Sequence, residues 1–337
     1  MHYPETYLDL LRRYGEPIES LVQPLSGFAT VYPPVGFLAW PFGDVGNGDF
    51  DGYYWPIGRE ARQPVVAQMS HDYWALNPTA SSVEALIGFG SYSHLREQLG
   101  FSAVPTPRNP LECFGSIEAW ASYVSARLEI DPHSPHYLVA RADVAVAQNE
   151  PDRAVSLYQQ AVEWLPEYTA AHYGLAVLSR RQRRPAEVVR WCLEAVRSPL
   201  AFRGASFWAE TCLPLEYVNR DDYRRKCLHW LGQAKPADAG EFERDPLFRE
   251  RHRLTFATGV TTNDDFLIYQ DAVAEYLALG QPLVAIRLAM LYGELISAEA
   301  TPFRERYGFT LDGHRDWLVK LFEKAGLTER RAFLQTS

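Results

Sequence analysis

The chain has 337 residues and a formal net charge of −9. At roughly 150 residues per domain this length predicts two or three structural units, and a composition of 47% hydrophobic and 22% charged residues excludes a mainly disordered chain. The acidic charge opposes the basic surface that binding to a nucleic-acid backbone needs, so we expect a protein partner and no nucleic-acid partner.

Two further features of the sequence predict a cytoplasmic protein without cofactors. The opening residues, MHYPETYLDL, carry acids where a signal peptide carries positive charge, and no apolar run reaches the length of about 18 residues that predicts a membrane helix. The cysteines are scattered without a Cys-x-x-Cys pair, which favours reduced structural thiols over a zinc site or a disulfide framework. We therefore expect no metal, no cofactor and no membrane partner. The cysteines are Cys113, Cys192, Cys212 and Cys227.

Residues 1–104 have the pattern of an α+β module. Residues 5–14 place apolar side chains on one side of a helix. Short apolar runs at 35–40 and 64–69, bounded by Gly and Pro, predict strands. A second helix is predicted over 82–90, where a pair of serines is placed to cap its first turn. The result is a meandering sheet with helices at both ends of the module.

After a proline-rich linker at 104–110, the sequence repeats with a period of 34 residues. Residues 135–168 align on 169–202, and the alignment superposes small and turn-forming residues. A period of this length is typical of stacked helix hairpins, or solenoids. The superposed pairs are Ala142 on Ala176, Gln148 on Gln182, Pro151 on Pro185, Val155 on Val189, Ala161 on Ala195 and Val162 on Val196.

The first copy of the repeat carries a small residue in its first helix, Ala, an aromatic residue and Ala in its second helix, and a closing Pro. The matching residues are Ala142, Ala154, Tyr158, Ala161 and Pro166. In this pattern the chain resembles the tetratricopeptide repeat family, which implies a helical solenoid over residues 112–202. The second copy departs from the pattern, because Val188, Cys192 and Leu200 replace the usual Ala, aromatic residue and Pro. Helical spacing continues beyond it and predicts further repeats or a helical cap.

Residues 43–60, GDVGNGDFDGYYWPIGRE, combine acids, glycines and three consecutive aromatic residues. The first half of the segment matches the calcium-binding loop of an EF-hand, but the position that needs a bidentate carboxylate is Gly58. We therefore favour a tight turn that leads into an aromatic strand. In that strand Tyr54 and Trp55 fill a core or line a groove.

Two other motifs carry candidate chemistry. His71 and Asp72 can serve as a base and its orienting acid, but no nucleophile elbow accompanies them, so a structural histidine is favoured over a hydrolase. The run Arg180–Arg184, RRQRR, lies at a turn between two repeat helices. We favour a solvated cluster there over a site for an acidic peptide or nucleic acid. Most tryptophans are expected in the core, with one or two lining the concave face.

A series of short motifs also occurs along residues 1–100. They are Tyr14-Gly15 at a helix end, Trp40–Gly43 at a strand end, the Gly46–Asp49 turn, Tyr54-Trp55, Pro64–Val66, His71-Asp72 and the helix from Ser81 to Ile87. Together they resemble the SUKH superfamily, although residues 17–34 do not align with its pattern. The resemblance implies an α+β fold used mainly by bacterial immunity proteins, which bind and neutralise a protein toxin and have no enzymatic activity.

We therefore predict an α+β protein with a SUKH-like module over 1–104, tetratricopeptide-like repeats over 112–202, and further helical repeats or a cap over 203–337. The first hypothesis is a bacterial immunity-type protein that neutralises a cognate toxin by stoichiometric binding. The alternative is a helical-repeat scaffold or regulatory adaptor that binds peptides through its solenoid; neither is an enzyme, and the oligomeric state stays open. The residues expected to contact a partner or to shape the contact loop are Asp44, Asp49, Asp51, Tyr54, Trp55, Glu60, His71, Asp72 and Trp74.

Overall fold

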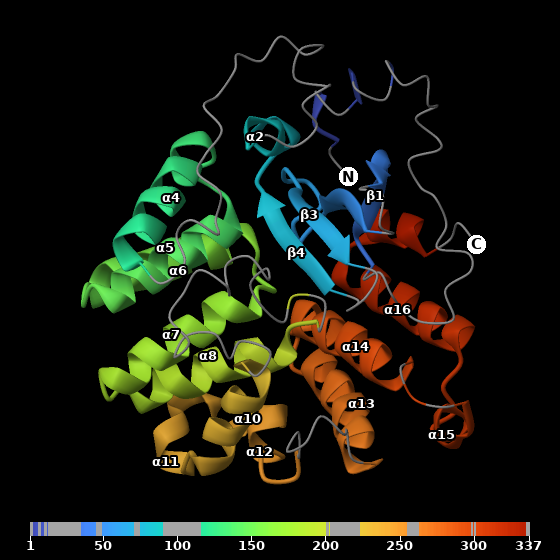
Figure 1. Cartoon of the computed structure of the whole chain (residues 1–337). Coiled ribbons are helices and arrows are strands. Elements are labelled where there is room, and N and C mark those ends of the chain that lie inside the picture. The colour runs from blue at the N-terminus through green and yellow to red at the C-terminus, as the bar shows by residue number, and fades with distance from the viewer. Residues whose placement is uncertain are drawn as a thin grey trace.

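The computed structural model shows an α+β fold (Figure 1). A four-stranded antiparallel sheet comes first, and the described residues after it are nearly all helical, which confirms the expected fold class. The helix predicted over 5–14 lies mostly outside the described residues, and the linker at 104–110 lies fully outside them. The structure describes residues 3–5, 8, 9, 12, 35–44, 49–70, 75–89, 116–199, 202, 223–254, 263–297, 299 and 301–334.

The sheet is a meander in which each strand pairs with the next one along the chain, as the sequence predicts. Its strands are β1 (Phe37–Asp44), β2 (Phe50–Tyr54), β3 (Val65–Ser70) and β4 (Ala75–Ala80). A short helix, α2 (Val83–Gly88), follows β4. The Ser82 hydroxyl accepts a hydrogen bond from the backbone N–H of Ala85 at 3.1 Å, which confirms the predicted serine cap.

The described residues from Ile117 to Phe333 are mainly helical. Three pairs of them, α5–α6, α7–α8 and α13–α14, pack as hairpins. Helices α5 and α7 begin at residues 135 and 169, so the hairpin repeat that the 34-residue period predicts is present. The helices are α4 (Ile117–Ile130), α5 (Pro135–Ala147), α6 (Pro151–Trp164), α7 (Thr169–Arg181), α8 (Pro185–Arg197), α10 (Tyr223–Gln233), α11 (Pro236–Ala239), η6 (Gly240–Arg244), α12 (Pro246–Arg249), α13 (Asn263–Ala278), α14 (Pro282–Ser297), α15 (Thr301–Arg306), α16 (Leu311–Ala325) and η7 (Thr328–Phe333).

The three hairpins use the same turn. The second residue after each first helix adopts a left-handed conformation, namely Asn149 (φ 59°), Arg183 (φ 58°) and Gly280 (φ 71°). The next N–H then bonds a carbonyl five residues back, as from Arg184 to Ser179 at 2.9 Å. A proline begins each second helix, where its missing N–H costs nothing.

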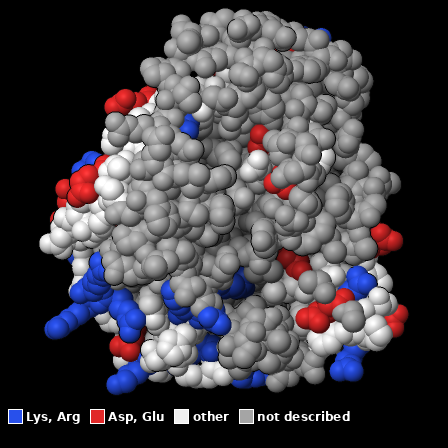
Figure 2. Space-filling model, viewed as in Figure 1, with Lys and Arg blue, Asp and Glu red and all other residues white. Residues whose placement is uncertain are grey.

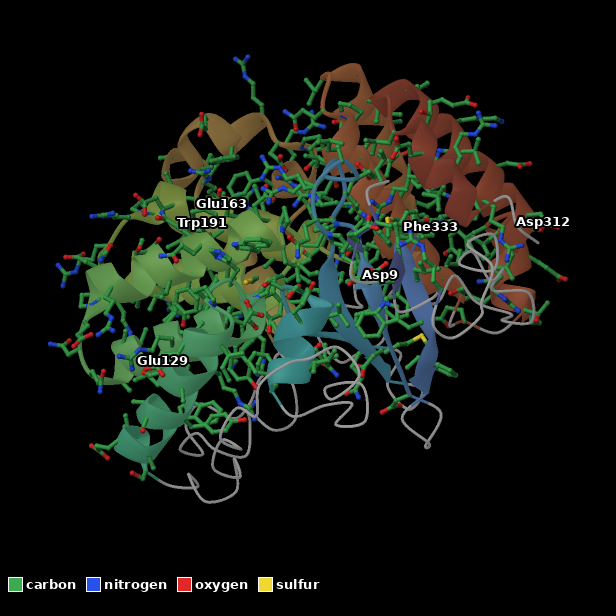
Figure 3. The ribbon with its side chains drawn as sticks, turned by 90° about the horizontal axis from the view of Figure 1, so that it is seen from above. Asp9, Glu129, Glu163, Trp191, Asp312 and Phe333 are labelled. Atoms are coloured by element: carbon green, nitrogen blue, oxygen red, sulfur yellow. The ribbon has the colours of Figure 1, made fainter. Side chains whose placement is uncertain are left out.

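Both faces of the sheet are covered, because alternate side chains of a strand point to opposite sides. One face, with Phe37 and Tyr54, packs against α5, α6 and α7. The other face, with Leu38 and Tyr53, packs against α2. Figure 3 shows Phe333, from η7, beside the strands, and its ring lies 5.9 Å from that of Trp55. The C-terminal η7 segment therefore packs against the sheet region near the start of the chain.

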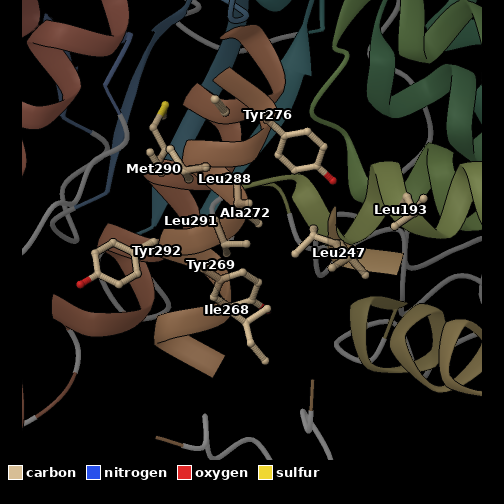
Figure 4. Close-up of a cluster of buried hydrophobic side chains, with 14 of the residues drawn as sticks. Leu193, Leu247, Ile268, Tyr269, Ala272, Tyr276, Leu288, Met290, Leu291 and Tyr292 are labelled. Atoms are coloured by element: carbon tan, nitrogen blue, oxygen red, sulfur yellow. The ribbon is translucent and has the colours of Figure 1, made fainter. Parts of the chain in front are cut away.

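The largest core lies among α8, α10, α12, α13, α14 and α16, and Figure 4 shows the part of it around α13 and α14. Val35 and Ile57, from the sheet region, belong to the same core. This core contains residues from all three predicted domains, 1–104, 112–202 and 203–337. The boundaries between these domains stay a prediction. None of the helices in the described ranges is long and apolar enough to cross a membrane.

Candidate anion-binding pocket

The segment predicted to contact a partner is mostly buried. A buried side chain can hold a loop in place but cannot touch a partner, so Tyr54 and Trp55 are not the exposed aromatics that such a contact needs. Partner contact by the other residues stays a prediction. Of the nine predicted residues, the structure buries Asp51, Tyr54, Trp55 and Glu60, leaves Asp49 half-buried, places the backbone of Asp44 at the end of β1 and does not describe His71, Asp72 and Trp74.

The position of β2 in the sheet explains this burial. Because β2 pairs with β1 on one side and β3 on the other, its successive side chains enter the two packed faces. Glu60 is buried by a different cause, an ion pair of 2.7 Å with Nη1 of Arg330. No local sequence pattern indicates that pair, since its members lie 270 residues apart.

A pocket of about 390 Å³ lies between the turn of the α7–α8 hairpin and the α10–α11 segment. We call it the arginine pocket, because Arg180, Arg183 and Arg184 all line it. All three arginines are exposed. The other lining residues are Pro185, Val188 and Val189 of α8, and Trp230, Gln233, Ala234 and Asp238 of the α10–α11 segment.

A ladder of stacked rings holds one of the arginines in place. The Tyr173 ring stacks on Tyr223 at 4.2 Å and on Trp230 at 5.6 Å, with interplanar angles of 15° and 17°. The guanidinium carbon of Arg180 lies 4.8 Å from the Trp230 ring centroid, a cation–π contact. Burial raises the pKa of Tyr173 to about 12, so this ring stays neutral at ordinary pH.

The positive charges of the pocket outnumber its available negative charges. The Arg183 guanidinium makes no hydrogen bond or ion pair with any described residue, although its backbone N–H bonds the Arg180 carbonyl at 3.1 Å. Arg184 pairs with Glu187 at 3.4 Å, but both side chains are exposed and such pairs are weak. Asp238, the acid in the lining, accepts a hydrogen bond from the backbone N–H of Lys235 at 2.9 Å. Figure 2 shows Lys and Arg side chains gathered at the lower left, over this end of the α7–α8 hairpin.

This arrangement is suited to binding an anion. Guanidinium groups stay charged at neutral pH and donate several hydrogen bonds in a planar fork that matches carboxylate and phosphate oxygens. They do not exchange protons with a substrate at that pH. In the part of the chain that the structure describes, no cluster of His, Cys, Asp or Glu side chains could hold a metal ion.

The sequence of Arg180–Arg184 favours a solvated cluster, but three of these arginines line a pocket. The other side of the pocket has no signal in the repeat pattern, because Trp230 and Gln233 come from a helix beyond the repeats. One sequence signal was present. The repeat alignment places Arg183 on Asn149, at a turn position that favours Asn or Gly.

Comparison with known proteins corrects both family resemblances. Residues 26–97 match the family model described as the YfbP N-terminal domain, and residues 257–332 match the YfbP C-terminal domain. The identification with the SUKH superfamily and the tetratricopeptide repeat family was wrong, because the matching models are these two. Most of the short motifs that suggested SUKH lie within residues 26–97, which match a different family model, and helix hairpins of similar length are not confined to one repeat family.

The chain is also similar to a protein of Escherichia coli (strain K12) that is named "Uncharacterized protein YfbP". The two sequences are 29% identical over 292 residues, which cover 86% of each chain. The residues that line the arginine pocket, within 180–238, come after the first matched segment and before the second in the sequence. The similarity to this protein thus extends over most of the chain.

Proposed function

We propose that this protein is a non-enzymatic adaptor that binds an acidic segment of a partner protein in the arginine pocket. The observation that carries the proposal is the set of three arginines around one pocket, of which the Arg183 guanidinium has no partner among the described residues. Placing such groups near one another costs free energy through repulsion, and a bound anion removes that cost. The proposal refines the peptide-binding scaffold that the helical repeat suggested.

A short acidic segment fits better than a nucleic acid. The net charge of −9 repels a long polyanion over most of the surface, whereas the arginine pocket reverses the charge only locally. The pocket also combines charge with the apolar side chains of Val188 and Trp230, which suits a peptide with mixed side chains. A cytoplasmic location is part of this proposal.

Toxin neutralisation stays an untested hypothesis. The resemblance on which it depended is contradicted, and four of the residues expected to contact a toxin are buried. No feature of the arginine pocket favours a toxin over any other protein that offers an acidic segment.

Photo-crosslinking in cells of the native host tests the adaptor proposal. A photoreactive residue replaces Gln233, which is exposed and lines the pocket, or Gln160, which is exposed on α6 and serves as the control position. We expect a crosslink from position 233 alone, to a segment rich in Asp and Glu that mass spectrometry identifies.

The Arg183→Gln/Arg184→Gln double variant should abolish that crosslink, because it removes two of the charges that hold the segment. A crosslink that survives the double substitution, or one to segments without acidic residues, would refute the proposal.

A further inference from the structure

We infer that the group recognised in the arginine pocket is a phosphate monoester on the bound segment. This inference depends on the proposed function, since it names the chemistry of the same ligand. It follows from the number of donors in the pocket, the helix end that opens there and the strained residue at the turn.

The charge and donors of the pocket match a phosphate better than a carboxylate. Arg180, Arg183 and Arg184 together supply three positive charges and up to about fifteen N–H donors, at five per guanidinium group. A phosphate monoester carries a charge of about −1.5 to −2 at neutral pH and three strong acceptor oxygens. A carboxylate carries one charge and two oxygens, so it leaves more of these donors without partners.

Helix α8 adds a fourth source of positive charge. Arg184 is its N-cap residue and Pro185 its first residue, and both line the pocket. No side chain caps the first turn of this thirteen-residue helix. Glu187 in the first turn pairs with Arg184 and offsets part of this charge. The partial charge of the free N–H groups still adds to that of Arg180 and Arg183, in the arrangement by which helix ends bind phosphate groups.

The conformation of Arg183 indicates that its side chain has a use. The equivalent turns carry Asn149 and Gly280, which tolerate positive φ better than other residues. An arginine in this conformation is less stable than Gly would be, and its guanidinium makes no described contact that compensates. A bound phosphate supplies a contact that explains why arginine occupies the position.

Fluorescence anisotropy with labelled ten-residue peptides tests the inference on the full chain. The peptides share one Glu-containing frame and differ at a central residue, which is serine, phosphoserine or glutamate. We expect the phosphoserine peptide to bind about tenfold more tightly than the serine peptide, with the glutamate peptide between them, because one added charge-assisted contact has about that effect.

Two double variants with the same change in net charge complete the design. Arg183→Gln/Arg184→Gln should remove the preference for phosphoserine. Arg153→Gln/Arg181→Gln should keep it, because both of these side chains are exposed and neither lines the pocket.

The outcomes separate the inference from the proposed function. If the serine and phosphoserine peptides bind equally well and through the same arginines, the adaptor proposal stands and the phosphate inference fails. If no peptide binds, both fail. The inference is also overturned if inorganic phosphate alone binds as tightly as the phosphopeptide, or if a single-stranded RNA oligonucleotide binds more tightly through the same arginines.

Discussion

Replacing Arg330 with methionine should destabilise the protein far more than replacing a charged side chain on its surface. The Arg330 side chain is fully buried. It donates hydrogen bonds to the Glu60 carboxylate at 2.7 Å, to the Trp55 carbonyl at 3.0 Å and to the Val35 carbonyl at 2.6 Å. It thereby joins η7, near the end of the chain, to the sheet region.

The contacts of Arg330 determine how much free energy of unfolding the variant loses. Methionine retains much of the volume but leaves the buried Glu60 with one described hydrogen bond, from the Gly58 N–H at 3.2 Å. Breaking a buried ion pair on one side costs about 3–5 kcal/mol. The carbonyls of Trp55 and Val35 lose a donor as well, so we expect a value in the upper half of that range. Folded proteins have a total stability of about 5–15 kcal/mol, so this is a large part of it.

Urea unfolding followed by circular dichroism measures the effect, and a neighbouring pair gives the control. Arg331 pairs with Glu323 at 2.7 Å on the surface, so Arg331→Met should cost less than about 1 kcal/mol. Adding Glu60→Gln to Arg330→Met should restore part of the stability, because it removes the unpaired buried charge. An Arg330→Met variant as stable as Arg331→Met would refute the reasoning.

Three further predictions concern backbone strain, pH and close packing. Arg183→Gly should raise the free energy of unfolding by about 0.5–1 kcal/mol, because glycine adopts the positive φ without strain; a lower urea midpoint would contradict this. Burial lowers the pKa of His314 from 6.5 to about 4. As the pH falls, the unfolded chain therefore binds a proton at this histidine before the folded chain does, and the free energy of unfolding drops by about 3 kcal/mol between pH 6.5 and pH 4. Unfolding measured across this range should show the fall in the wild type and a smaller one in His314→Leu, and equal slopes would count against the prediction. Gly174→Ala should cost about 1–3 kcal/mol, because its methyl group would lie 2.6 Å from Cε2 of Tyr158. The control Gly232→Ala, whose nearest atom is 4.0 Å away, should cost nothing, and thermal melting that ranks the two variants the other way would exclude this explanation.

Several local features could be predicted because a few neighbouring residues encode them. The serine that caps α2 needs only its own hydroxyl and the N–H three residues later. The apolar runs at 35–40 and 64–69 became β1 and β3 because bounded apolar runs suit a packed strand. The 34-residue period predicted the α5–α6 and α7–α8 hairpins for the same reason, since each copy carries its own turn.

The role of the segment around Glu60 could not be predicted in this way. Acids and aromatics near a glycine turn are compatible with either a surface loop or a buried strand, and the choice depends on what packs against them. Glu167 is another example, because it follows the predicted closing proline yet is buried, where it accepts a hydrogen bond from the Ile57 N–H at 2.6 Å. Burial raises the pKa of its carboxyl group.

The sequence by itself determined the α+β class, the sheet meander and the helix hairpins, since each follows from spacing and capping within some tens of residues. Only the tertiary structure decided that Glu60 pairs with Arg330, one of 33 basic residues in the chain, and that Arg180 packs on the Trp230 ring at the edge of a pocket. These contacts join residues far apart in the chain, and no local pattern specifies which distant partner a side chain meets.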